Sequence, residues 1–321
     1  MINNRVAVID LGTNTFNLLI AEPTDQGKFE AIHREQFVVK IGEGGISKGL
    51  INEEAQKRLF RALDLIYKAL QLYKVKEQSI WGLATSAFRN ARNAREIISE
   101  IKRNYGISIE IISGDQEAEY IYYGVRNALD LGEQNSLLID IGGGSVEFII
   151  CNRRKIHWKR SIEIGVQRLM DQYMRTDPIS DLDIQRLEIY LESRFVELSA
   201  AVFNYSPKHL IGSAGAFETL SAIDLFRQEG EKAQEYIDKN HQLLLPEYEL
   251  LIDEFHYIYQ QIVCKERVQR LTIPGMADFR VDMIVPATCL IKFVIERYEL
   301  ELIRVSGYAL KEGFLVWKLG E

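Results

Sequence analysis

The chain has 321 residues, enough for two domains that each bury their own core. Its apolar fraction of 47% and charged fraction of 26% are typical of a globular protein, and no apolar run is as long as a transmembrane helix. The net charge of −7 argues against a general nucleic-acid binder, which would carry a basic excess. A polyanionic substrate stays compatible, because local arginines and metal ions can offset the overall charge.

Cysteine and histidine usage indicates neither a disulfide framework nor a zinc site. The three cysteines, Cys151, Cys264 and Cys289, are scattered and odd in number, which is typical of reduced thiols. The five histidines show no ligand spacing. The N-terminus leads directly into an apolar strand without a signal-type segment, so we expect a cytoplasmic protein.

Residues 6–20 read as strand, turn and strand. Asp10 ends the first strand, and the turn contains Gly12, Thr13, Asn14 and Thr15. Glycine lacks Cβ, so it can adopt a positive φ and let a ligand approach the backbone. Two interpretations stay open here: an ordinary glycine turn, or a nest of N–H groups that binds an anion.

Two further strand ends carry polar residues. A helix capped by Asn52 runs to about residue 75, and the short strand 80–84 follows it. This strand leads to Thr85 and a helix that carries Arg89, which suits either a phosphate contact or a plain helix cap. The strand 107–112 leads to a helix whose first turn contains Glu117. Acidic residues are favoured there by the helix dipole alone.

A second strand–turn–strand unit spans residues 137–150. Asp140 and Glu147 bracket the turn, which is formed by Gly142, Gly143, Gly144 and Ser145. Carboxylates beside a phosphate repel it unless a divalent cation intervenes, so Mg²⁺ is the expected guest.

The two hairpins match when they are aligned on Asp10 and Asp140. Ile9, Gly12 and Ile20 then correspond to Ile139, Gly142 and Ile150. This repeat predicts two similar halves, with hairpins that hold a phosphate chain from both sides.

The last third of the chain is predicted from weaker patterns. We expect one long helix over 181–202, and a strand followed by a turn at Gly215 that offers a third phosphate contact. Pro246 is expected to open a helix, and Arg280 to pair with Asp282.

Four sequence blocks together resemble the exopolyphosphatase / guanosine pentaphosphate phosphatase (Ppx/GppA) family of the actin-like superfamily. They are Asp-Leu-Gly-Thr-Asn-Thr at 10–15, Ala-Thr-x-Ala-x-Arg-x-Ala-x-Asn at 84–93, Gly-x-x-Glu-Ala at 114–118, and Asp-Ile-Gly-Gly-Gly-Ser-x-Glu at 140–147. The resemblance covers almost the whole chain, in the short two-domain form. Long members append further helical domains.

The resemblance implies an α/β fold of two actin-like (ribonuclease H-like) domains flanking a central cleft, each with a mixed five-stranded sheet. Domain I would comprise residues 1–124 plus 307–321, and domain II residues 125–306.

The implied activity is metal-dependent hydrolysis of a terminal phosphoanhydride bond. Glu117 would be the base that accepts a proton from water, and Arg89 the phosphate-binding arginine. Asp10, Asp140 and Glu147 would organise Mg²⁺, with Mn²⁺ as the alternative. The implied phosphate-binding residues are Gly12, Thr13, Asn14, Thr15, Thr85, Arg89, Gly142, Gly143, Gly144, Ser145 and Gly215.

Two positions depart from the family pattern. Asn17 stands where members more often carry Arg or His, and Ala214-Gly215-Ala216 replaces a loop that usually carries hydroxyl groups. We prefer inorganic polyphosphate as the substrate, because no base-reading motif is recognisable. Guanosine pentaphosphate, an actin-like ATPase or kinase, and a non-catalytic sensor of polyphosphate or alarmone stay open as alternatives, and so does a homodimer.

Overall fold

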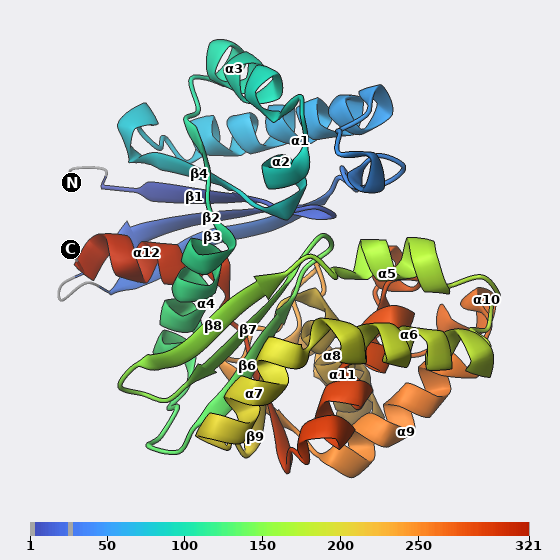
Figure 1. The fold of residues 1–321 in the computed structure, drawn as a ribbon. Helices are drawn as coiled ribbons and strands as arrows, with labels where there is room; N and C mark the ends of the chain where they lie inside the picture. Colours follow the sequence, from blue (N-terminus) through green and yellow to red (C-terminus); the bar gives the residue numbers. More distant parts are fainter. Residues whose placement is uncertain (1–3, 25–27, 321) are drawn as a thin grey trace. The chain divides into compact units, whose positions relative to one another are not determined.

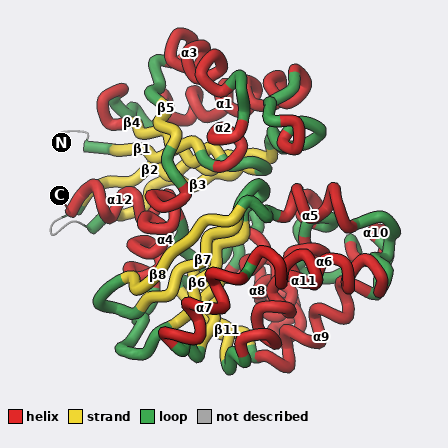
Figure 2. The backbone as a smooth tube through the Cα atoms, viewed as in Figure 1, coloured by secondary structure: helices red, strands yellow, loops and turns green. Residues whose placement is uncertain are grey.

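The computed structural model describes residues 4–24 and 28–320, which form two compact units (Figures 1 and 2). Unit 1 comprises Met1–Gly124 and Leu310–Glu321, and unit 2 comprises Val125–Ala309. Each unit is built on its own mixed sheet.

The sheet of unit 1 has the strand order β3-β2-β1-β4-β5. The first three strands pair antiparallel and the last three parallel. The strands are β1 (Val6–Leu11), β2 (Thr15–Pro23), β3 (Phe29–Val38), β4 (Ile80–Ala84) and β5 (Ile109–Ile111). The helices are η2 (Ile46–Lys48), α1 (Glu53–Leu72), η3 (Glu77–Ser79), α2 (Ser86–Asn90), α3 (Ala94–Tyr105), α4 (Gly114–Ala128, which runs on into unit 2) and α12 (Leu310–Gly320).

Helices cover both faces of this sheet. The face that carries Ala7, Ile9 and Leu11 packs against α1 and α3, and α12 packs against the opposite face (Figure 1). The Asn52 side chain caps α1 by accepting a hydrogen bond from the Ala55 N–H at 2.9 Å, as predicted. This packing leaves the carboxyl end of β1 and the turn after it at the edge of the core.

The sheet of unit 2 has the order β10-β11-β9-β6-β7-β8. Its strands are β6 (Ser136–Ile141), β7 (Val146–Cys151), β8 (Ile156–Ile162), β9 (His209–Ser213), β10 (Glu247–Leu250) and β11 (Leu302–Ser306). The helices are α5 (Val166–Tyr173), α6 (Asp181–Arg194), α7 (Val196–Tyr205), α8 (Gly215–Glu229), η4 (Gly230–Tyr236), α9 (Ile252–Val263), α10 (Arg267–Arg270), η5 (Asp278–Arg280) and α11 (Ile284–Tyr298).

The pairing pattern repeats between the two sheets. From β8 through β7, β6 and β9 to β11, two antiparallel pairs are followed by two parallel pairs, as from β3 to β5 in unit 1. The internal repeat is therefore present in the topology. The prediction of five strands in each sheet is wrong for unit 2, because β10 adds an antiparallel edge strand.

Two predicted helices are also corrected. Pro246 does not open a helix. Its carbonyl accepts a hydrogen bond from the Gly307 N–H at 3.0 Å, the strand β10 follows, and α9 begins only at Ile252. The long helix over 181–202 is interrupted at Phe195, whose buried ring packs edge-on against Phe148 while its backbone leaves the helical conformation (φ −98°, ψ 14°).

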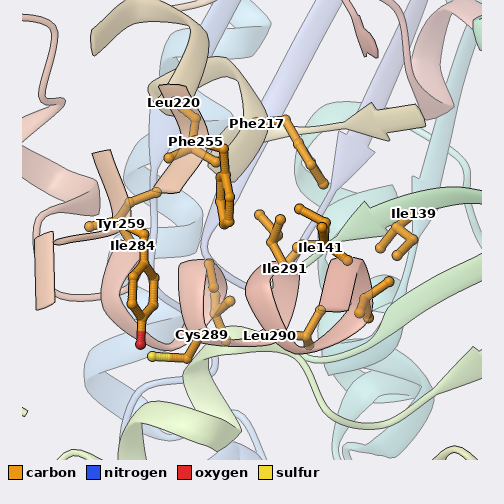
Figure 3. Close-up of a cluster of buried hydrophobic side chains, with 14 of the residues drawn as sticks. Ile139, Ile141, Phe217, Leu220, Phe255, Tyr259, Ile284, Cys289, Leu290 and Ile291 are labelled. Carbon is orange, nitrogen blue, oxygen red and sulfur yellow. The ribbon is translucent and has the colours of Figure 1, made fainter. Parts of the chain in front are cut away.

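The core of unit 2 is formed by α8, α9 and α11 against the sheet. Figure 3 shows the Tyr259 hydroxyl pointing at the Cys289 thiol, with Phe217 and Phe255 nearby. Burial raises the pKa of Cys289 to about 12. Within the described part of the chain, no helix combines the length and apolarity needed to cross a membrane.

Candidate active site

The turn of the second hairpin is anchored by its carbonyl groups. The Gly142 N–H donates to the Ser145 carbonyl at 3.1 Å. The carbonyls of Gly142, Gly143 and Gly144 accept hydrogen bonds of 3.0, 2.9 and 3.1 Å from backbone N–H groups of residues 165–167, where α5 begins. A trans peptide points its C=O and the next N–H in opposite directions. The N–H groups of residues 143–145 are therefore turned away from α5, as an anion-binding nest requires.

The turn glycines serve close approach, not a left-handed conformation. Neither Gly12 nor Gly142 has a positive φ, so that part of the prediction is wrong for these two residues. A Cβ on Gly142 would lie 3.0 Å from the Ser145 carbonyl oxygen. A Cβ on Gly165 would lie 2.4 Å from backbone atoms of Gly143 and Gly144, so Gly165 lets α5 begin directly behind the turn.

The first hairpin has the same construction. The Gly12 N–H donates to the Thr15 carbonyl at 3.1 Å. The carbonyls of Thr13 and Asn14 accept hydrogen bonds from backbone N–H groups of residues 39–42 at 2.9–3.2 Å. This loop thus does for the first turn what the start of α5 does for the second, and the N–H groups of Asn14 and Thr15 are turned the other way.

Asp140 and Glu147 lie directly opposite each other on β6 and β7, so their side chains share one face of the sheet. The Asp140 residue is 8% exposed and Glu147 is 1% exposed. The Ser213 hydroxyl donates to Asp140 Oδ2 at 2.6 Å. The hydroxyls of Ser145 and Ser161 both donate to Glu147 Oε1, at 2.8 and 2.7 Å. Sequence reasoning missed Ser161 and Ser213 as part of this site; the available signal was a hydroxyl residue at a strand end.

The chemistry of these oxygen donors fits Mg²⁺. Two neighbouring buried carboxylates repel each other, and a divalent cation relieves that repulsion. Mg²⁺ is usually held by one or two carboxylates, with substrate phosphate and water completing its shell. Such completion is needed here, because the described residues contain no group of three or more His, Cys, Asp or Glu side chains that could hold a metal. Asp10 belongs to unit 1, and its share in binding the cation stays a prediction.

Arg89 and Glu117 contact each other within unit 1. Arg89 lies on α2 and Glu117 in the first turn of α4, and Nη1 lies 2.6 Å from Oε2. Nη1 also donates to the Ile112 carbonyl at 3.2 Å. The two side chains are 16% and 10% exposed, so little water competes for the pair. The structure thus brings the predicted base and the predicted phosphate-binding arginine together.

Thr85 is the N-cap residue of α2, but its side chain makes no capping hydrogen bond. The plain-cap interpretation of this buried threonine is therefore not supported. Thr85 begins directly after β4, which runs parallel to β1, so its backbone lies beside the end of the Asp10 strand.

The loop between β9 and α8 is supported from below by Arg280. Its guanidinium donates to the Gly215 carbonyl at 2.9 Å and to Glu218 Oε2 at 2.9 Å. The predicted Arg280–Asp282 pair is wrong, because Asp282 pairs with Arg267 instead. Ala214 adopts φ 68° and ψ −177°, a conformation that is almost confined to glycine.

Comparisons with known proteins agree with this geometry. The model of the Ppx/GppA phosphatase family matches residues 19–321. A Haemophilus influenzae protein named as an exopolyphosphatase is 26% identical over 311 residues, which cover 97% of this chain and 90% of that protein. A guanosine-5'-triphosphate,3'-diphosphate pyrophosphatase of Pseudoalteromonas translucida is 28% identical over 319 residues, but the chain spans only 60% of its length.

The crystal structure of an exopolyphosphatase from Cytophaga hutchinsonii matches with a TM-score of 0.90 and 38% identity. The match covers 98% of this chain and 97% of that one. The predicted fold class, two α/β domains of the actin-like type, is confirmed.

Proposed function

The chain belongs to the Ppx/GppA phosphatase family, and from this premise we propose that it is a metal-dependent exopolyphosphatase. It releases orthophosphate from the end of inorganic polyphosphate by hydrolysing the terminal phosphoanhydride bond. The observation that carries the proposal is the pair of turns whose carbonyls are tied to a backing segment, one in each unit. Their N–H groups suit the oxygens of a phosphate chain, and no side-chain cation is needed at these contacts.

Water activation is assigned to Glu117. Its carboxylate accepts a proton while the water oxygen forms a bond to the terminal phosphorus. The bond from that phosphorus to the bridging oxygen breaks, and the bridging oxygen leaves with the electron pair on the shortened chain. Arg89 stabilises the negative charge on the transferred phosphoryl group, and a divalent cation held by Asp140 and Glu147 would supply further charge neutralisation.

The contact between Arg89 and Glu117 supports this division of roles. A guanidinium has five N–H donors in a fixed plane, so Arg89 can contact a phosphoryl oxygen and still orient the glutamate. The ion pair holds Glu117 in place before the substrate arrives. A base and an oxyanion-binding group in direct contact are the arrangement that in-line attack on a terminal phosphate requires.

The choice of polyphosphate rests on chain coverage. The relatives that the chain matches over 90% or more of their length are named as exopolyphosphatases. The relative named for a guanosine nucleotide extends well beyond the matched region. Guanosine pentaphosphate presents the same terminal group, so it is the second candidate substrate.

The test is phosphate release from long-chain polyphosphate and from guanosine pentaphosphate, measured side by side with and without Mg²⁺. Wild-type protein is expected to turn over polyphosphate only with the metal. Glu117→Gln should lose about 10²–10⁴-fold in rate, the typical contribution of a general base. Release from the nucleotide alone would overturn the substrate assignment. A folded protein that hydrolyses neither would return the ATPase, kinase and sensor alternatives, which micromolar ATP binding and ligand binding without turnover would distinguish.

A further inference from the structure

The two hairpins have the same backbone register but different charges. Asp140 on β6 faces Glu147 on β7, which faces Ser161 on β8. In unit 1 the same three positions of the ladder are occupied by Asp10 on β1, Asn17 on β2 and Gln36 on β3. The residue that corresponds to the second carboxylate is therefore a neutral amide.

A directed chain of hydrogen bonds connects these three residues. Gln36 Nε2 donates to Asn17 Oδ1 at 2.8 Å, and Asn17 Nδ2 donates to Asp10 Oδ2 at 3.0 Å. An amide has its donor and its acceptor on different atoms, so the bond from Gln36 fixes which end of Asn17 faces the aspartate. Asn17 thereby presents a donor to Asp10, whereas Glu147 can present only acceptors to Asp140.

This difference decides where a divalent cation finds two carboxylates. In unit 2, Asp140 and Glu147 share one face, and serines hold one oxygen of each. In unit 1, the amide holds Asp10 Oδ2 and keeps the matching position uncharged. Partners behind a ligand fix its orientation, and their loss typically weakens metal binding 10–100-fold.

We propose that Asn17 and Gln36 are positioning residues that orient Asp10 and confine the two-carboxylate cation site to the second hairpin. The inference deepens the proposed function and rests on it. It makes a sharp forecast, because Asn17→Asp is isosteric. The substitution replaces a donor by an acceptor 3.0 Å from Asp10 Oδ2 and recreates in unit 1 the pair of carboxylates found in unit 2.

The experiment measures Mn²⁺ binding without substrate, by paramagnetic resonance of free Mn²⁺, together with thermal unfolding at increasing Mn²⁺. Wild type is expected to bind one ion, and Glu147→Gln to lose it. Asn17→Asp should bind one ion more than wild type. Its melting temperature should be lower than that of wild type without metal and should recover as Mn²⁺ is added.

Two further variants keep the proposal falsifiable if Asn17→Asp does not fold. Gln36→Met removes the donor that orients Asn17 and should raise the Mg²⁺ concentration for half-maximal phosphate release about tenfold, without lowering the melting temperature. Glu30→Gln, an exposed position on the same strand β3, should change neither.

The outcomes separate the two levels of the argument. If Glu147→Gln loses the ion but Asn17→Asp and Gln36→Met behave as wild type, Asn17 and Gln36 are structural only and the inference fails. If Glu147→Gln binds Mn²⁺ like wild type, the metal assignment in the proposed function fails.

Discussion

Replacing Ala214 by glycine should stabilise the protein, because the alanine holds a backbone conformation that suits only glycine. Ala214 has φ 68° and ψ −177° in the loop between β9 and α8. A non-glycine residue in this region costs about 1–3 kcal/mol in the folded state. Glycine in turn makes the unfolded chain more flexible, which costs about 0.4–1 kcal/mol. The balance predicts that Ala214→Gly raises the free energy of unfolding by about 1 kcal/mol, the lower part of what these ranges allow.

The matched control lies at the next residue. A Cβ on Gly215 would lie 2.6 Å from Cζ of Arg280, about 1 Å inside normal carbon contact. Arg280 cannot move aside without losing its bonds to Gly215 and Glu218. Gly215→Ala should therefore destabilise by about 1–3 kcal/mol, the usual cost of overpacking.

Thermal and urea unfolding of both variants provide the assay. About 1 kcal/mol corresponds to about 2–4 °C in melting temperature for a unit of this size. The two substitutions should move the transition in opposite directions. A melting temperature for Ala214→Gly equal to or below that of wild type would show that the strain argument for this loop is wrong.

Two further predictions follow from close contacts and from burial. Gly165→Ala should reduce phosphate release and lower the melting temperature, because its Cβ would meet the backbone of Gly143 and Gly144 at 2.4 Å; Gly320→Ala, with open space at its Cβ, is the control, and unchanged release would contradict the role of Gly165. For the thiols, we expect only the exposed Cys264 to react with Ellman's reagent in the native protein, as read by absorbance against a denatured sample. Burial raises the pKa of Cys151 to about 12, above the ordinary value of 9.0. The unfolded chain therefore loses this proton first, so the contribution of Cys151 to stability is complete below pH 9 and is lost as the pH rises from 9 towards 12. The urea midpoint should fall between pH 8 and pH 10.5, and a fall equally large in Cys151→Ala would refute the assignment to this thiol.

The sequence was informative where the signal is local. Each hairpin carries its aspartate, its glycine turn and its second polar residue within a dozen positions, so both hairpins and their correspondence could be found from spacing alone. The strand 80–84 and the cap at Asn52 were predicted for the same reason. Short-range periodicity and turn chemistry operate over these distances.

The parts that escaped prediction depend on contacts between distant segments. Ser213 reaches Asp140 only because β9 pairs beside β6, 73 positions away in sequence. The break at Phe195 arises from a ring that packs on β7, and the edge strand β10 forms only beside β11. No pattern within residues 181–202 or 246–263 announces either partner.

The duplication of the sheet and the division of chemistry between its copies belong together. A repeated unit alone would place the same groups in both halves, yet the base and its arginine lie in unit 1, and the paired carboxylates lie in unit 2. Corresponding ladder positions show the divergence directly: Asn17 stands for Glu147, and Leu83 of β4, next to Asp10, stands for Ser213. Substitution at these few positions changes the local charge without disturbing the strands, since the backbone register is the same in both copies. The proposed hydrolysis therefore requires groups from both units, and neither half carries a complete set.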